Sequence, residues 1–440
     1  MLKRFACLII SLLVVGCSGA ADDTGGEKFP TQVPGRDTNP GRVFSNADPK
    51  VTAGLPSEFT TATLAGAGAR ELKPSRGDAA PQGESEDLTV GGRDWPVFRG
   101  NLQATGWLPK VTLGPLRERW RFALEKGQFE SSPVIAGGLV FAASSGGELV
   151  AVGLESGTLV WRARAEGAFT ASPSVFGGRV FIGDDTGLFY CWHARKGELL
   201  WKFSAEGPID SPASFWEGNV LFGSQDGNLY CLEATSGQLR WKYTSDDQIR
   251  CFPAICEGKA FLAGCDGHLH VVDLAKGEMD LRVPLEGPTG NAAAVLGEMA
   301  YVGTENGRFI GINWKTAKVV WVFQEFSAPT SIRTSAAVTP EIVVFGARDG
   351  KIRALRPDTG QLVWSFSARR KIDSSPVLLS DRVVFGSDDG RLYIVDATSG
   401  NLVTEYDLGA AVVSGPAVIS NAMVVGTMQG ELICLEWTGV

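Results

Sequence analysis

The 440-residue chain is poor in charge, in histidine and in long apolar runs. Only 20% of its residues are charged, it has three histidines, and 41 Lys and Arg are outnumbered by 49 Asp and Glu. Neutralising phosphates requires a basic surface, so no nucleic-acid partner is expected. No P-loop, dinucleotide fingerprint or hydrolase nucleophile motif occurs in its strand-turn-helix context, which argues against those enzyme classes.

Glycine and tryptophan are plentiful instead. The chain has 55 Gly and 12 Trp and shows no sustained helical period. This composition is typical of many short strands joined by tight turns. The sequence therefore predicts an all-β protein, a class in which one domain often exceeds 200 residues.

The N-terminus carries an export signal. The letters MLKR precede an apolar run over residues 5–16, which at about 12 residues is too short to span a bilayer and fits a signal peptide. The run ends in VVGC, which resembles the lipobox of bacterial lipoproteins, although plain secretion with cleavage elsewhere is the alternative. The resemblance implies that residues 1–16 are removed and that Cys17 is lipidated. Because Ser18 and not Asp follows, it also implies sorting to the outer membrane, facing the periplasm.

A long polar segment follows the lipobox. Residues 17–94 are rich in Gly, Pro, Ala, Thr and Asp, with no sustained period of 2 or 3.6. Such a segment buries too little apolar surface to offset the entropy of ordering it. We expect a disordered tether between the lipid and the folded domain.

The rest of the chain, residues 95–440, is an internal repeat. A turn glycine recurs at intervals of 40 residues, with one interval of 43, and a tryptophan keeps one phase of the same period. The glycines are Gly147, Gly187, Gly227, Gly267, Gly307, Gly350, Gly390 and Gly430. The tryptophans are Trp120, Trp161, Trp201, Trp241, Trp321 and Trp364, with Leu281 and Thr404 in their place in two copies. We interpret the tryptophans as structural groups that dock each outer strand on its neighbour, and expect weaker packing at the two exceptions.

Each copy predicts four short antiparallel strands. In the seventh copy these are residues 373–379, 382–386, 391–395 and 401–406, separated by turns such as Asp-Asp-Gly before residue 391. Four strands per repeat of about 40 residues describe a β-propeller blade. The last copy lacks a fourth strand, and residues 116–122 form an orphan strand ahead of the first copy. We therefore expect that strand to close the ring, giving an eight-bladed propeller of four-stranded antiparallel blades.

Several motifs identify the repeat with a known family. The letters ATSG at 397–400 and 234–237, DTG at 358–360, and the Trp four residues beyond most of these glycines resemble the repeat of pyrroloquinoline quinone (PQQ) propellers. Residues 94–101 look like the segment that often precedes such propellers. One branch of the family comprises PQQ-dependent dehydrogenases with calcium, a catalytic Asp, long insertions and often a Cys-Cys disulfide. The other is the cofactor-free, BamB-like lipoprotein branch of outer-membrane protein assembly.

This chain matches the second branch in layout. It has no Cys-Cys pair and its compact repeats leave no room for active-site insertions, although the long tether is unusual for that branch. The resemblance implies a non-catalytic, monomeric scaffold that binds protein partners in the cell envelope and needs no cofactor. A PQQ-dependent dehydrogenase or PQQ sensor is the alternative, as is a propeller serving another envelope or signalling system.

The residues that enter each innermost strand should ring one mouth of the central channel. By repeat phase we place there Glu130, Thr170, Asp210, Arg250, Gly290, Arg333, Asp373 and Ser414. Mixed carboxylates and guanidiniums at one opening predict either a ligand or partner site or a set of mutually paired, solvated charges. The charged members, Glu130, Asp210, Arg250, Arg333 and Asp373, are the candidate site.

Cysteine and histidine offer weaker candidates. A hairpin centred near Gly258 would set Cys251 opposite Cys265, which would allow a cross-strand disulfide, but buried free thiols are the favoured interpretation. His268 and His270 share a strand face and suggest a metal site, but His268 takes a solvent-facing phase, so no metal is expected. The basic cluster at 369–371 is a docking spot or, more simply, a solvated loop.

Overall fold

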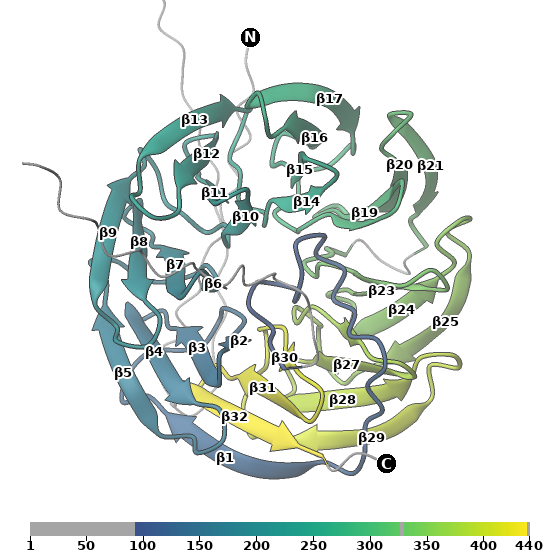
Figure 1. The fold of residues 1–440 in the computed structure, drawn as a ribbon. Helices are drawn as coiled ribbons and strands as arrows, with labels where there is room; N and C mark the ends of the chain where they lie inside the picture. Colours follow the sequence, from purple (N-terminus) through teal and green to yellow (C-terminus); the bar gives the residue numbers. More distant parts are fainter. Residues whose placement is uncertain (1–92, 326–329, 438–440) are drawn as a thin grey trace, which may run out of the picture. The chain divides into compact units, whose positions relative to one another are not determined.

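The computed structural model describes residues 93–325 and 330–437, and these form an all-β ring (Figure 1). Thirty-two strands make eight sheets of four strands each, so the predicted eight-bladed propeller is confirmed. The predicted signal peptide, Cys17 and nearly all of the tether lie outside the described residues. Within the described part of the chain, no helix is long and apolar enough to cross a membrane.

The blades are numbered here I to VIII in chain order, each from its innermost to its outermost strand. Blade I comprises β2 Val134–Ala136, β3 Leu139–Ala143, β4 Glu148–Gly153 and β5 Leu159–Arg164; blade II comprises β6 Ser174–Phe176, β7 Arg179–Gly183, β8 Leu188–His193 and β9 Leu199–Ser204. Blade III comprises β10 Ser214–Trp216, β11 Asn219–Gly223, β12 Asn228–Glu233 and β13 Leu239–Thr244; blade IV comprises β14 Ala254–Cys256, β15 Lys259–Ala263, β16 His268–Asp273 and β17 Glu278–Pro284. Blade V comprises β18 Ala294–Leu296, β19 Met299–Gly303, β20 Phe309–Asn313 and β21 Lys318–Phe323; blade VI comprises β22 Ala337–Val338, β23 Val343–Gly346, β24 Lys351–Leu355 and β25 Leu362–Ser367. Blade VII comprises β26 Val377–Leu378, β27 Arg382–Gly386, β28 Arg391–Asp396 and β29 Leu402–Asp407; blade VIII comprises β30 Ala417–Val418, β31 Ala422–Gly426, β32 Glu431–Glu436 and β1 Arg117–Ala123.

The strand boundaries follow the local sequence in all but the innermost strands. Strand β27 has the predicted bounds, and Gly390 takes φ +84° in the tight turn before β28, as an Asp-Gly turn requires. The innermost strand β26 is shorter than residues 373–379. Ser374 and Ser375 instead bond across blades: Ser374 Oγ donates to the carbonyl of Ser414, and Ser375 Oγ accepts the amide of Ser335.

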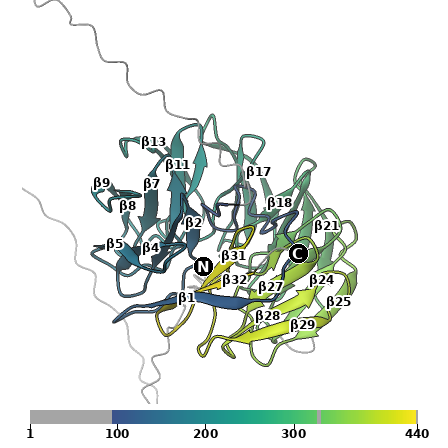
Figure 2. The same cartoon turned by 60° about the horizontal axis from the view of Figure 1, so that its bottom comes forward.

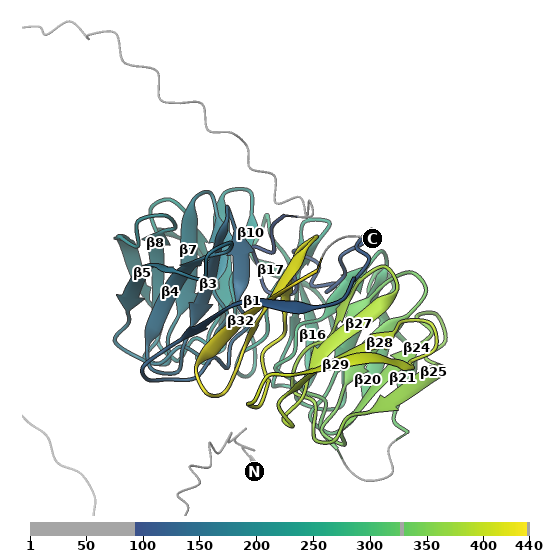
Figure 3. The same cartoon turned by 90° about the horizontal axis from the view of Figure 1, so that it is seen from below.

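Ring closure pairs the two ends of the propeller. Strand β1 lies antiparallel to β32, side by side in Figures 2 and 3, with Trp120 opposite Cys434 and a bulge as in the other blades. Ion pairs span the two strands: Arg117 and Arg119 bind Glu436, and Arg121 Nη1 lies 2.6 Å from Glu431 Oε2. The predicted closing strand is confirmed, shifted by one residue.

An N-terminal plug, residues 95–111, fills part of the channel in a way that the repeat did not predict. This dark blue segment lies inside the ring in Figure 1 and forms backbone hydrogen bonds with six of the eight innermost strands. The partners are Ile135, Val175, Ile255, Val295, Val338 and Leu378. Because the plug binds the strands themselves and the mouth residues precede those strands, the plug lies deeper along the axis than the mouth.

The recurrent tryptophans contact the following blade. Each ring lies over a glycine of that blade's outer turn, so close that an added Cβ would be 2.5–2.7 Å from the ring. The glycines are Gly157, Gly197, Gly237, Gly277, Gly360 and Gly400. Five of the six indoles also donate to a carbonyl there, as Trp161 Nε1 does to Ala194 at 2.8 Å. Packing and a hydrogen bond therefore join consecutive blades.

The blades without this tryptophan are packed differently from our expectation. Blade V carries Trp314 at the repeat position of Ala194, and Trp314 packs edge-on against Phe261 in the core cluster that Leu281 borders. The glycine position there is Ala317, because no indole ring of blade IV needs the space. Trp437 takes the same repeat position after Thr404, is only 3% exposed and belongs to a core cluster that includes Ile394 of blade VII and borders Tyr406. A tryptophan thus fills both junctions from the opposite side.

The pairing of ring and glycine can be tested with G197A. We expect it to lower the free energy of unfolding by about 2 kcal/mol, because the new Cβ overlaps the Trp161 ring. In a W161L background, which reproduces the natural Leu281 and Ala317 pair, G197A should lower the free energy of unfolding by less. The strain of a positive φ at position 197 is the same in both backgrounds and cancels from the comparison. An equal cost in both backgrounds, measured by urea unfolding, would contradict the interpretation.

Ring closure should be sensitive to acid. The hydrogen bond from Arg119 and the charges of Arg119 and Arg117 lower the pKa of Glu436 despite the opposing effect of desolvation. A carboxylate with a lowered pKa stabilises the fold above its unfolded pKa, and this contribution disappears as pH falls through the folded pKa. The stability difference between wild type and E436Q should therefore shrink between pH 7 and pH 3. E198Q, an exposed change on blade II, controls for the loss of one charge.

Candidate ligand site at the channel mouth

The predicted mouth residues come together in one cavity on the propeller axis. All eight line it, and the cavity has a volume of about 190 Å³. One position was assigned a residue too late. Ser414 is the repeat equivalent of Ser374, and the hydroxyls of both donate to backbone carbonyls, those of Gly426 and Ser414 respectively. Val413 is the repeat equivalent of Asp373 and also lines the cavity. The charged residues of the rim are the same as predicted: there are five, on five different blades.

Asp210 is the most heavily hydrogen-bonded carboxylate of the rim. Arg250 of the next blade binds it, with Nη2 2.7 Å from Oδ2. Thr170 Oγ1 donates to Oδ1 at 2.7 Å, and Gln225 Nε2 donates to Oδ2 at 2.6 Å. Asp210 thus joins blades II, III and IV at the mouth, and its charge is neutralised by Arg250.

The other side of the rim is also paired. Arg348 holds Asp373 with two parallel hydrogen bonds of 2.8 Å, and Lys371 lies 3.3 Å from the same carboxylate. The hydrogen bond and charge of Asp373 raise the pKa of Arg348, so this guanidinium stays charged at any physiological pH. Arg333 Nε is 3.3 Å from Glu305 Oε2. The paired-charge alternative therefore describes four of the five charged rim residues.

Glu130 is the exception. Its side chain is exposed and makes no hydrogen bond or ion pair with any residue of the described ranges. Since the other rim charges are paired, Glu130 leaves the rim with one uncompensated negative charge.

The inner end of the cavity is built by the plug. Phe98 lines it and packs against Phe252, with ring centroids 5.9 Å apart. The neighbouring Arg99 is 3% exposed, and its Nη2 donates to the carbonyls of Ala336 and Pro376. Burial lowers the pKa of Arg99 to about 9, so its guanidinium is still charged at neutral pH. No carboxylate of the described chain contacts it.

A layer of serines between rim and plug was missed in the sequence. Ser132, Ser172, Ser335 and Ser375 all lie two residues after a rim position and all line the cavity. The signal was present as a serine at constant phase in four copies. It went unnoticed because serine is common, and only the ring geometry turns these residues toward one axis.

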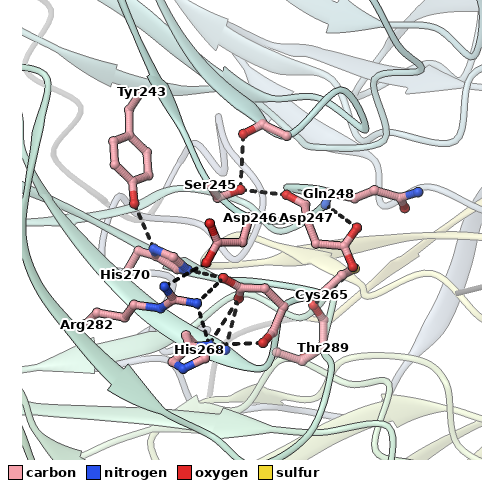
Figure 4. Close-up of polar contacts among 12 residues, drawn as sticks. Tyr243, Ser245, Asp246, Asp247, Gln248, Cys265, His268, His270, Arg282 and Thr289 are labelled. Carbon is pink, nitrogen blue, oxygen red and sulfur yellow. Dashed lines mark hydrogen bonds and ion pairs between the residues drawn. The ribbon is translucent and has the colours of Figure 1, made fainter. Parts of the chain in front are cut away.

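The two histidines of blade IV belong to a separate polar network (Figure 4). His270 is buried; its Nδ1 lies 2.8 Å from Tyr243 Oη and its Nε2 2.8 Å from Asp266 Oδ2. Arg282 contacts both His268 and Asp266: its Nη2 lies 2.9 Å from His268 Nδ1 and 3.0 Å from Asp266 Oδ2. Burial opposes ionisation of Asp266, but the hydrogen bond and charge of His270 lower its pKa overall. In the described chain no group of three or more His, Cys, Asp or Glu is arranged to hold a metal.

The disulfide that we considered between Cys251 and Cys265 is not formed. Both residues are thiols. The hairpin turns at two residues, with Ala254 opposite Phe261, so its register would set Cys251 opposite Gly264 and not Cys265. The Cys265 thiol instead faces the carbonyl of Thr289, with Sγ 3.8 Å from the oxygen. A one-residue error in the centre of the hairpin accounts for the wrong pairing.

The fold of this chain is similar to that of several solved structures. BamB from Moraxella catarrhalis superposes with a TM-score of 0.64 at 19% identity, over 73% of this chain and all of that one. The quinohemoprotein alcohol dehydrogenase of Comamonas testosteroni gives 0.69 at 12% identity, over 78% and 80%. The computationally designed Ika8 protein gives 0.64 at 18% identity, over 72% and 98%. At these identities the likeness shows the fold alone.

The sequence comparison is more specific. No curated protein sequence matches the chain. The family described as outer membrane protein assembly factor BamB (PQQ_2) matches residues 116–250, 188–278 and 225–439, which together cover most of the chain and every blade. The protein is thus an eight-bladed propeller with a small axial cavity. It belongs to the BamB family of PQQ-like repeat proteins.

Two carboxylates of the rim, one paired and one unpaired, should differ in their contribution to stability. We expect D210N to lower the free energy of unfolding by about 1–3 kcal/mol, because Arg250 loses a charged hydrogen-bond partner. E130Q should change it by less than about 0.5 kcal/mol, because Glu130 has no partner to lose. Urea unfolding of both variants checks this, and a similar effect of the two would show that the Asp210 contacts are not formed in solution.

Proposed function

We propose that this protein is a non-catalytic scaffold of the cell envelope that binds protein partners in outer-membrane protein assembly. It is exported, lipidated on Cys17 and held by its tether at the periplasmic face of the outer membrane. The observation that carries the proposal is the family match across residues 116–439, whose description names an outer membrane protein assembly factor. The lipobox-like VVGC at residues 14–17 supports the anchor.

The outer strands of the blades support a protein-binding role. Several of them present exposed apolar side chains at the free edge of their sheet, where an extended segment of a partner could add as a further strand. These side chains are Leu159, Val160, Leu199, Leu200, Leu239, Met279, Val319, Val320, Val322, Leu362, Val363, Leu402 and Val403. In contrast, the closing strand β1 presents Glu118 and charged arginines, which disfavours that edge as a binding site.

The alternative is a PQQ-dependent enzyme, because a quinohemoprotein alcohol dehydrogenase has a similar fold. The residues present do not fit a quinone with a metal ion. The cavity of about 190 Å³ is smaller than the roughly 300–1,000 Å³ of sites for drug-sized ligands. Asp210 and Asp373 already bind arginines, and the described residues offer no cluster of metal ligands at the mouth. We therefore derive no reaction through PQQ.

Photo-crosslinking in the living envelope tests the scaffold. A crosslinking amino acid at Leu199, on the edge of β9, should capture a protein of the outer-membrane assembly machinery, whereas one at the exposed turn residue Glu217 should not. C17A should remove both lipid labelling and membrane retention. Capture of no assembly component, together with dye-linked alcohol oxidation by the purified protein in PQQ and Ca²⁺, would replace the scaffold with the enzyme.

A further inference from the structure

The serine layer of the cavity has unused hydrogen-bond donors. Each serine oxygen accepts an amide from the preceding blade: Gly415 to Ser132, Ser132 to Ser172, Ala292 to Ser335 and Ser335 to Ser375, all at 2.9–3.0 Å. The four hydroxyl hydrogens have no acceptor among residues 93–325 and 330–437. These side chains are 3–8% exposed and line the cavity. Four buried donors therefore share one cavity.

The four donors occupy one side of the axis. Ser335 and Ser375 belong to blades VI and VII, while Ser132 and Ser172 enter blades I and II, so they form one arc broken only by Gly415 of blade VIII. Arg99 reinforces that arc. Its guanidinium donates to the carbonyls of Ala336 and Pro376, the residues that directly follow Ser335 and Ser375. A buried positive charge without a carboxylate partner thus lies beside the hydroxyl donors.

The opposite side of the same layer is apolar. The corresponding residues of blades III, IV and V are Pro212, Phe252 and Ala292, and Phe98 of the plug packs on Phe252. None of these side chains offers a hydrogen bond. The inner cavity therefore has a donor-rich, electropositive side and an apolar side facing each other.

We infer that this cavity binds a small carboxylate whose carbon skeleton is apolar. The carboxylate oxygens accept hydrogen bonds from the serine arc within the field of Arg99, and the apolar group lies against Phe98 and Phe252. A carboxylate fits better than a phosphate dianion, because the rim above carries Glu130 as an uncompensated negative charge. The ligand is either a free apolar acid or the C-terminal residue of a polypeptide. The inference does not depend on the proposed protein partner.

Calorimetric titration of the purified propeller with N-acetyl-leucine and with the peptide Ala-Ala-Leu tests this. We expect binding of at least one, no binding of N-acetyl-leucinamide or amidated Ala-Ala-Leu, and weaker binding of acetate, which lacks the apolar group. Tighter binding of the peptide than of the amino acid would identify a polypeptide C-terminus as the ligand, and the reverse a free acid. Inorganic phosphate bound as tightly as either, or no carboxylate bound at all, would overturn the inference.

Variants locate the site. S335A and S375A should each weaken binding about tenfold or more, because each removes a hydrogen bond to a charged group. S374A is the matched control, because the buried Ser374 hydroxyl donates to the carbonyl of Ser414 and does not line the cavity.

E130Q should tighten binding about two- to threefold by removing a negative charge from the rim. Because Glu130 has no partner, E130Q keeps the test decisive if the serine variants unfold. Equal loss in S374A, or weaker binding by E130Q, would contradict the assignment.

Discussion

The pairing of β1 with β32 is the constraint on which the whole ring depends. Each blade is stabilised mainly by docking on the next, so an open chain of blades would leave two unpaired faces and a free edge. The closing strands are more than 300 residues apart in sequence, as the pairing of Arg117 with Glu436 shows. Their contact uses interstrand ion pairs in addition to the usual tryptophan, and Arg119 extends it to Glu155 of blade I.

Blade docking shows how a repeat keeps its geometry while its residues change. An indole and a glycine face each other at six junctions, and where the indole is missing the partner blade supplies Trp314 or Trp437. Each of these junctions contains a tryptophan, although the blade that supplies it differs. Tight packing explains this, because neither an empty space nor an overlap of ring size is tolerated there.

The channel combines two different surfaces. At the mouth, charges from neighbouring blades neutralise one another, so most of the rim acts as a clamp between blades. Deeper in, the plug closes the channel with Phe98 and places the charge of Arg99 where no carboxylate reaches it. The plug follows residues 17–94 directly in the sequence, so the segment that shapes the cavity is joined to the one that we expect to tether the protein.

The sequence by itself determined the number of blades, the four strands of each, the closing strand and all but one of the rim residues, because all of these repeat at a constant phase and depend on local turn and strand patterns. Only the tertiary structure decided the path of the plug, the ion pairs of the rim, the shift of tryptophan between blades and the register of Cys251. The plug has no repeat to align it. The other features depend on which residues of different blades face each other, and a one-residue shift in register changes every such contact.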